Sequence, residues 1–408
     1  MKVAIISIGD ELMNGFTLDT NSSWISRKVL EYESLDVVSK VIVKDDEADI
    51  KYTLGSLIDN DIDYIFITGG LGPTHDDITK KTLSDFFKSK LVLNEPYYSK
   101  LIEYFKGKNH KIIDHLETQA LMLENSTIVS NRYGTALGMK IEYKKSQIFV
   151  LPGVPREVKG MVEEEILPFY FDSKFTKEKK YITILTTGIY ESQLFEILKD
   201  IIERNNKFFK VSFLPSYTGV KIRLSKILKD KNLDEFKSLI IEPIKEFVYG
   251  LDDDKIVNII AKKLINSNMT IATAESCTGG NISKMLTSVS GSSNYFKGAI
   301  IAYSNCIKLD FLNIENKLLD DKGAVSSEVA IMMAKNIRNK FNVNIGLSTT
   351  GISGPTGGAK DKPVGLVYIA IATEKEQILK KVILDLPRKE HRIATTHIAL
   401  NLLNLFLK

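Results

Sequence analysis

The sequence predicts an α/β protein with several domains, and three observations support this fold class. The chain has 408 residues, more than one hydrophobic core normally holds. Roughly the first 170 residues, and again the stretch after residue 252, alternate apolar strand-like runs with helical ones. Between them, a polar and lysine-rich stretch at 172–180 indicates a linker, followed by a small α+β segment. We therefore expect three domains, at residues 1–172, 173–251 and 252–408.

In the first segment, short apolar runs alternate with amphipathic stretches. Strands are expected at residues 3–8, 37–43, 64–68 and 148–151, and helices at 21–30 and 48–58. This order favours a mostly parallel sheet with both faces covered.

The middle and last segments are assigned in the same way. In the middle segment we expect strands at 181–187, 210–213 and 220–224, and helices at 191–203 and 233–249. In the last segment we expect strands near Met269, Gly298, Val343 and Val364, and helices near Lys255, Thr278, Ser326 and Arg388.

The composition excludes several classes of protein. Hydrophobic residues make up 44% and charged residues 26% of the chain, which is ordinary for a soluble globular protein. The net charge of +4 comes from scattered lysines, so no nucleic-acid partner is expected. No apolar run reaches the roughly 18–20 residues of a membrane span, and no signal peptide is recognised. The two cysteines, Cys277 and Cys306, argue against a disulfide scaffold, so we expect a cytoplasmic protein without a membrane partner.

A polar turn after the apolar strand at 269–274 is the most informative local feature. Small residues let a ligand approach the backbone, and free amides at the start of the next helix attract negative charge. The turn therefore predicts an anion or nucleotide site made by Glu275, Ser276, Thr278, Gly279 and Gly280. Cys277 lies in the same turn, and we interpret it as a buried thiol because no histidine is near it in sequence.

Two serines, a tyrosine and a lysine follow this turn. Hydrolysis of a carboxamide needs a nucleophile, a base and donors for the developing oxyanion. One of Ser292 and Ser293 could attack if Lys308 were held neutral, since the ordinary lysine pKa is about 10.4. Tyr303 could relay the proton or position the carboxamide. In the alternative interpretation, the serines form a turn, Tyr303 packs on a strand and Lys308 lies on the surface.

A stretch rich in Gly, Ser and Thr, residues 348–358, follows the apolar strand at 343–347. Ligands bind at the carboxyl ends of strands in α/β sheets, and glycine backbone amides can form an oxyanion hole or a phosphate site. The candidate site residues in this stretch are Thr350, Gly351 and Gly354. Arg388 and Arg392 are four residues apart on one expected helix face, so they could bind a phosphate or form a solvated basic face.

The first segment contains a second candidate site. A glycine-rich loop with Gly69, Gly70, Gly72 and Thr74 joins a strand to a helix, which suits phosphate binding. Four carboxylates lie beside it if the strands are parallel, and such carboxylates suit Mg²⁺ or a similar divalent metal. They are Asp10, Glu11, Asp76 and Asp77. Capping of the next helix by Asp76 and Asp77 is an alternative that is compatible with this role.

Long motifs spread over nearly the whole chain resemble the competence/damage-inducible CinA family. IGDELMNGFTLDTNSSWIS, ITGGLGPTHDDITKKTL, NRYGTALGM and LPGVPREVKGM are similar to its N-terminal domain, which is related to molybdopterin-binding proteins. TTGIYES resembles the start of its KH-type middle domain. ATAESCTGG, GSSNYFKGAIIAYSNCIK, GAVSSEVA and STTGISGPTGG resemble its C-terminal nicotinamide mononucleotide deamidase domain.

This resemblance implies a molybdopterin-binding-like sandwich with a parallel or mixed sheet, a small α+β KH-type domain and an α/β/α deamidase domain. In the last domain it implies Ser293 as the nucleophile, with Tyr303, Lys308 and Thr350 as its catalytic partners. The family arginine near the last helix most resembles Arg392, with Arg388 as the alternative. The deamidase needs no cofactor and converts nicotinamide mononucleotide to nicotinic acid mononucleotide and ammonia.

For the N-terminal domain, the resemblance implies an ADP-ribose pyrophosphatase that uses a divalent metal. Nicotinamide mononucleotide and ADP-ribose are thus the expected small-molecule ligands, and a homodimer is the expected assembly. Two alternatives belong to other classes of function. The N-terminal domain could bind a nucleotide or pterin without catalysis, or the protein could be a partner in DNA competence or recombination.

Overall fold

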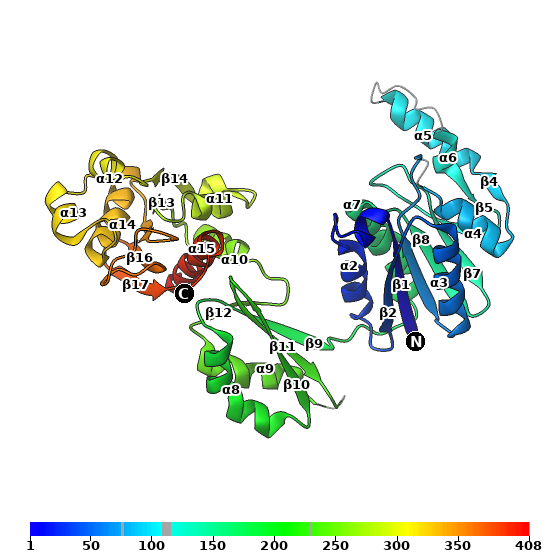
Figure 1. Ribbon diagram of the computed structural model, residues 1–408, viewed down its shortest axis with the longest axis horizontal. Helices are drawn as coiled ribbons and strands as arrows, with labels where there is room; N and C mark the ends of the chain where they lie inside the picture. Colours follow the sequence, from blue (N-terminus) through cyan, green and yellow to red (C-terminus); the bar gives the residue numbers. More distant parts are fainter. Residues whose placement is uncertain (75–76, 108–115, 229–230, 408) are drawn as a thin grey trace. The chain divides into compact units, whose positions relative to one another are not determined.

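A computed structural model of the chain describes residues 1–74, 77–107, 116–228 and 231–407. The chain divides into two compact units, Met1–Lys180 and Tyr181–Lys408, and each is described by itself (Figure 1). The second unit contains two separate sheets. None of the helices in these described ranges is both long and apolar enough to cross a membrane.

The first unit is built on a six-stranded sheet with the order β2-β1-β3-β8-β7-β6. Its parallel strands are β1 (Lys2–Ile8), β2 (Asp36–Val43), β3 (Tyr64–Thr68) and β8 (Ser146–Leu151). Two further strands, β7 (Gly138–Tyr143) and β6 (Ser126–Val129), join in antiparallel fashion. A separate two-stranded sheet pairs β4 (Leu91–Leu93) with β5 (Leu121–Leu123).

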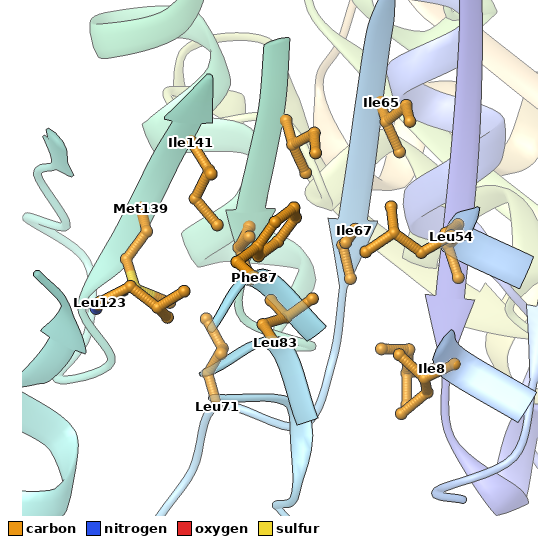
Figure 2. Packing of buried hydrophobic residues seen from close by; sticks show 14 of the residues in the cluster. Ile8, Leu54, Ile65, Ile67, Leu71, Leu83, Phe87, Leu123, Met139 and Ile141 are labelled. Atoms are coloured by element: carbon orange, nitrogen blue, oxygen red, sulfur yellow. Dashed lines mark hydrogen bonds between the residues drawn. The ribbon is translucent and has the colours of Figure 1, made fainter. Parts of the chain in front are cut away.

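Helices cover both faces of this sheet. Among the helices, α1 (Asp10–Met13) has no buried residue, and α5 (Glu95–Gly107) and α6 (Leu116–Ala120) share a separate hydrophobic cluster. One face of the sheet is covered by α2 (Thr20–Val29), α7 (Pro155–Met161) and the π-helix η1 (Val162–Phe171), and the other by α3 (Glu47–Asp59) and α4 (Thr79–Phe87). Strand β1 shows why: Ala4 and Ile6 point to one hydrophobic cluster, while Val3 and Ile5 point to the other. Figure 2 shows the first cluster, where strand residues such as Ile67 pack with Leu54 and Leu83 of α3 and α4.

The second unit begins with a four-stranded antiparallel sheet of order β10-β11-β9-β12. Its elements are β9 (Tyr181–Thr186), α8 (Glu191–Asn205), β10 (Phe209–Ser216), β11 (Gly219–Lys226), α9 (Leu233–Ile241), the 3₁₀ turn η2 (Glu242–Ile244) and β12 (Val248–Leu251). The helix expected at 233–249 is wrong in its second half. Pro243 has no backbone N–H to continue the α-helix, so the chain tightens and turns into β12 instead.

The rest of the second unit is a five-stranded sheet of order β14-β13-β15-β16-β17. Its strands are β13 (Ile271–Glu275), β14 (Phe296–Ile301), β15 (Ile345–Gly351), β16 (Leu366–Ala372) and β17 (Gln377–Ile383). The helical elements are α10 (Ile256–Asn266), α11 (Asn281–Thr287), the 3₁₀ turn η3 (Ser292–Asn294), α12 (Asn305–Leu312), α13 (Asn316–Lys322), α14 (Ser327–Phe341) and α15 (Arg388–Phe406). The edge strand β17, which alternates exposed and half-buried residues, was not expected from the sequence.

Two hydrophobic clusters on opposite faces of this sheet give an α/β/α arrangement. One cluster joins Ile271 of β13 to α10, α11 and α15, and the other joins Ala272 and Ala274 to α12, α13 and α14. Strands β14, β13 and β15 are parallel, so their carboxyl ends lie at the same edge of the sheet. The predicted α/β fold class is confirmed, and this edge is where ligands bind in such sheets.

Candidate active site

A pocket of about 170 Å³ opens at the carboxyl ends of β13 and β15. Its lining comes from the turn after β13, the loop after β14, helix α12, the segment before α14, the end of β15 with the loop after it, and the first residue of α15. The lining residues are Ser276, Cys277, Tyr303, Lys308, Ala324, Val325, Thr350, Gly351, Ser353 and Arg388. Several residues singled out in the sequence therefore meet in one pocket.

Lys308 of α12 is the central group of this pocket and is 1% exposed. Its Nζ lies 2.8 Å from the carbonyl oxygen of Ala302 and 3.4 Å from Oγ of Ser276. Burial lowers the pKa of Lys308, although the Cys277 and Cys306 thiols oppose this. The interpretation of Lys308 as a surface residue is therefore wrong.

Ser276 is the hydroxyl that meets this amine. It directly follows β13, and its backbone N–H donates to the Thr349 carbonyl of β15 at 2.9 Å, which fixes the serine at the pocket. When Lys308 is neutral, the same 3.4 Å contact lets the Ser276 hydroxyl donate to the amine lone pair. A serine and a buried amine in contact form a nucleophile and base of the kind that needs no histidine.

Ser293, the expected nucleophile, does not meet Lys308 in this chain. It lies exposed in the turn η3, before the first residue of β14, whereas Lys308 follows the last residue of β14. The six residues of β14 span about 20 Å, so the two residues lie at opposite edges of the sheet. The alternative interpretation of Ser292 and Ser293 as a turn matches this geometry.

Tyr303 and Arg388 form the other side of the pocket. Nη2 of Arg388 donates to the hydroxyl of Tyr303 at 2.7 Å, and Nη1 donates to the carbonyl of Gly354 at 2.9 Å. Tyr303 is 59% exposed, so it lies at the mouth rather than packing on a strand. Arg388, rather than Arg392, is the arginine that lines the pocket.

Thr350 and Gly351 lie beside Ser276 at the end of β15. The Thr350 hydroxyl donates to the Ala324 carbonyl at 2.7 Å, which ties the segment before α14 to the pocket. The Gly351 position has no room for a side chain, because a Cβ would lie 2.7 Å from the Leu366 carbonyl oxygen.

The anion cradle predicted at the start of α11 is already filled by a side chain. The carboxylate of Glu275 is fully buried and accepts from the amides of Gly280, Ile282 and Ser283 at 2.8–3.1 Å. Thr278 is also buried, and its hydroxyl bonds with that of Thr349. Glu275 and Thr278 therefore build the turn, and the amides that Glu275 occupies are not available to a substrate phosphate.

Arg392 holds the same turn from the other side. Its guanidinium donates to the carbonyls of Cys277 and Thr278 at 3.1 and 3.0 Å. A Cβ on Gly279 would lie 2.7 Å from Nη2 of Arg392, and Gly279 has a φ of +57°, so this position favours glycine. These contacts give Arg392 a positioning role.

Cys277 is buried, and burial raises the pKa of its thiol to about 12. The thiolate form is therefore scarce at neutral pH, which agrees with the interpretation as a buried thiol. Ser353, which also lines the pocket, was not singled out from the sequence. Its only signal was its place inside the Gly-, Ser- and Thr-rich stretch.

In the first unit, the glycine-rich loop and two of the acidic residues lie at the same sheet edge. Gly69 follows β3, and a Cβ on it would lie 2.2 Å from the carbonyl oxygen of Ile8 at the end of β1. Asp10 and Glu11 begin α1, one residue after the end of β1, and are exposed. A Cβ on Gly70 would lie 2.1 Å from Oγ1 of Thr79 in α4.

Among the residues that the structure describes, no group of three or more His, Cys, Asp or Glu side chains could hold a metal ion. Asp77 accepts hydrogen bonds from the Thr74 amide and hydroxyl, and its carboxylate lies against Gly72. The expected ligand Asp76 lies outside the described residues. The described part of the expected ligand set thus does not form a complete metal site by itself.

Two ionisable groups of the first unit, the buried Lys80 and the half-buried Glu157, were missed in the sequence. Burial lowers the pKa of Lys80 to about 8, and its Nζ donates to the carbonyls of Thr118 and Gln119. Burial also raises the pKa of Glu157, whose carboxylate accepts from Asn131 at 2.6 Å. Both residues stand inside the quoted motifs ITGGLGPTHDDITKKTL and LPGVPREVKGM, but the motifs gave no sign that either side chain would be removed from solvent.

Three family models match successive parts of the chain. They are described as the probable molybdopterin binding domain (residues 4–171), the damage-inducible protein CinA KH domain (182–250) and the CinA C-terminal domain (253–407). The CinA-like protein of Flavobacterium psychrophilum is 40% identical over 403 residues, covering 96% of this chain and 94% of that protein. The chain belongs to the CinA family. The resemblance read from the motifs is therefore confirmed.

Further matches include a second relative over nearly the whole chain and a solved structure over a shorter part of it. The CinA-like protein of Cytophaga hutchinsonii is 37% identical over 411 residues, covering 99% of this chain and 97% of that protein. The crystal structure of competence/damage inducible protein CihA from Agrobacterium tumefaciens is 34% identical, with a TM-score of 0.36, and covers 38% of this chain and 96% of that chain.

Proposed function

We propose that the pocket of the second unit hydrolyses the carboxamide of nicotinamide mononucleotide, giving nicotinic acid mononucleotide and ammonia. The observation that carries this proposal is the contact of Ser276 Oγ with the buried amine of Lys308. It supplies a nucleophile and a base inside one pocket. The CinA membership of the chain and its resemblance to the deamidase domain suggest the substrate.

In the proposed reaction, Ser276 Oγ bonds to the carboxamide carbon while its proton passes to neutral Lys308. The protonated lysine then gives a proton to the leaving nitrogen, the C–N bond breaks, and ammonia departs from an acyl-serine. A water molecule attacks the ester while Lys308 takes its proton, and return of that proton to Ser276 releases the carboxylate product. The lysine ends each half-reaction neutral.

The oxyanion of the tetrahedral intermediates needs a donor beside Ser276. Ile352 N–H donates to the Leu366 carbonyl at 2.8 Å, which makes this a hydrogen-bonded pair of β15 and β16. Gly351 and Val367, the preceding pair, are then of the non-hydrogen-bonded type. The Gly351 N–H consequently points away from β16, toward β13 and Ser276, where an oxyanion would form.

Product analysis tests this proposal directly. Purified full-length protein is incubated with nicotinamide mononucleotide, and ammonia and nicotinic acid mononucleotide are measured with and without chelator. We expect equal amounts of both products, unaffected by chelator. Absence of both products from folded protein would reject the proposed function.

A second activity is proposed for the first unit, cleavage of the ADP-ribose pyrophosphate with a divalent metal. The observation that favours it is the approach of the Gly69 loop to the end of β1, beside the exposed carboxylates of Asp10 and Glu11. Such an edge suits a pyrophosphate, and a bound metal would offset its charge. Turnover of ADP-ribose that stops in excess chelator is expected. Binding of ADP-ribose without cleavage would instead favour a non-catalytic nucleotide-binding domain.

A further inference from the structure

The pocket contains a buried hydroxyl that has no partner. Ser353 follows β15 by two residues, lines the pocket and is 5% exposed. Among the described residues, its Oγ finds no hydrogen-bond partner. Leaving a buried hydroxyl unpaired is costly, and such groups in native proteins usually have a ligand or a bound water as partner.

The neighbourhood of Ser353 is cationic. The carbonyl of the next residue, Gly354, accepts from Nη1 of Arg388, so the hydroxyl and the guanidinium belong to adjacent parts of the pocket wall. A guanidinium has five N–H donors, and within the described part of the chain Nη1 and Nη2 of Arg388 make one bond each. Arg388 is also the first residue of the 19-residue helix α15, so the positive end of the helix dipole lies on this side.

The composition of the pocket selects an anion over a neutral polar group. The described lining residues include Lys308 and Arg388 but no aspartate or glutamate. Ribose hydroxyls are commonly held by carboxylates, whereas phosphoryl oxygens accept from arginine and hydroxyl donors. The Lys308 amine already contacts Ser276 and the Ala302 carbonyl. Arg388 is therefore the cation of the pocket lining that can bind an anionic group.

We propose that Ser353 is a substrate-positioning residue whose hydroxyl, together with Arg388, holds the phosphoryl group of the nucleotide. The carboxamide then lies at Ser276 and Lys308, and the phosphate lies at the opposite side of the pocket. This inference rests on the proposed deamidase function. Because Ser353 and Arg388 bind the phosphoryl group, they are the residues that make the enzyme prefer a nucleotide to the corresponding nucleoside.

The kinetic test compares nicotinamide mononucleotide with nicotinamide riboside, which lacks the phosphate. In Ser353→Ala, we expect the ratio of the two kcat/KM values to fall about tenfold, through a higher KM for the nucleotide. The matched control is Ser290→Ala, an exposed serine outside the pocket, which should keep the wild-type ratio. An unchanged ratio in Ser353→Ala, with a wild-type enzyme that deamidates the nucleotide, would overturn the inference.

A binding test separates this inference from the proposed function. Calorimetry with ribose 5-phosphate as the probe measures the phosphate side of the pocket without any reaction. We expect binding to wild-type protein that weakens about tenfold in Ser353→Ala and persists in Ser290→Ala. If the wild-type protein shows no deamidase activity but binding depends on Ser353, the proposed function fails and the phosphate site stands. Binding that is absent, or equal in both variants, rejects the phosphate site.

Discussion

Nζ of Lys308 lies 3.4 Å from Oγ of Ser276, and both residues are buried at the edge of a sheet where three parallel strands end. The hydrogen-bond partners of the amine are a hydroxyl and the carbonyls of Ala302 and Tyr303, so no carboxylate of the described residues stabilises its charge. Burying an ammonium group without a counter-ion is unfavourable, so the site favours the neutral amine that a base requires.

The first prediction concerns pH. Since Lys308 must be neutral to accept a proton, kcat/KM should be low in acid, rise with pH and level off above the pKa of Lys308. Burial lowers that pKa, so the rising limb should lie below the roughly 10.4 of free lysine. Initial rates of ammonia release across a pH series would show this. If kcat/KM rose only at or above the ordinary lysine pKa, the interpretation of Lys308 as a buried neutral base would be contradicted.

The second prediction separates the chemistry of Lys308 from its packing. Lys308→Met keeps most of the buried volume but has no basic nitrogen, so deamidation should fall about 10²–10⁴-fold. Lys308→Arg should be equally impaired, because a guanidinium stays protonated at neutral pH. Thermal unfolding checks that Lys308→Met is folded. A folded Lys308→Met variant with wild-type rates would exclude Lys308 as the base.

The third prediction distinguishes the two arginines of α15. Arg388 lines the pocket, so Arg388→Lys should raise KM for the nucleotide about tenfold, because a single ammonium cannot reproduce the guanidinium contacts. Arg392 instead binds two carbonyls of the turn, so Arg392→Met should mainly lower the free energy of unfolding, by about 1–3 kcal/mol. Steady-state kinetics and urea denaturation of both variants test this division. The reverse pattern would assign phosphate binding to Arg392.

The fourth prediction concerns the buried carboxylate of Glu275. Glu275→Gln replaces one acceptor oxygen with an NH₂ group facing amides of α11, so it should destabilise the protein by about 2 kcal/mol. The matched control is Glu374→Gln, at an exposed position between β16 and β17. Equal denaturation midpoints for both variants would show that the carboxylate does not hold the start of the helix.

Much of the fold could be predicted because buried parallel strands are continuous apolar runs. In the run at Val3–Ile8, Ala4, Ile6 and Ile8 face one cluster, and Val3 and Ile5 face the other, so every residue except Ser7 is hydrophobic. The edge strand β17 escaped prediction because its half-exposed sequence QILKKVI includes two lysines. The end of α9 was missed because apolar residues continue past Pro243 at helical spacing, whereas proline cannot continue the backbone hydrogen bonds.

The site was predicted less completely, and the reasons are geometric. Sequence spacing brought Ser293 and Lys308 within fifteen positions, but a whole strand of six residues lies between them and separates them in space. Ser276 is 32 positions from Lys308, yet parallel pairing of β13 with β14 returns the chain to the same edge. The helix-terminus argument was correct about free amides, but it could not show that Glu275 itself fills them.

The central claim is that Ser276, activated by Lys308, is the nucleophile. The decisive measurement is ammonia release from nicotinamide mononucleotide by Ser276→Ala and by Ser293→Ala, each in the full chain and each shown to be folded by thermal unfolding. The account predicts a loss of at least about 10³-fold in kcat for Ser276→Ala and a rate within about twofold of wild type for Ser293→Ala. An active Ser276→Ala beside an inactive Ser293→Ala would contradict it.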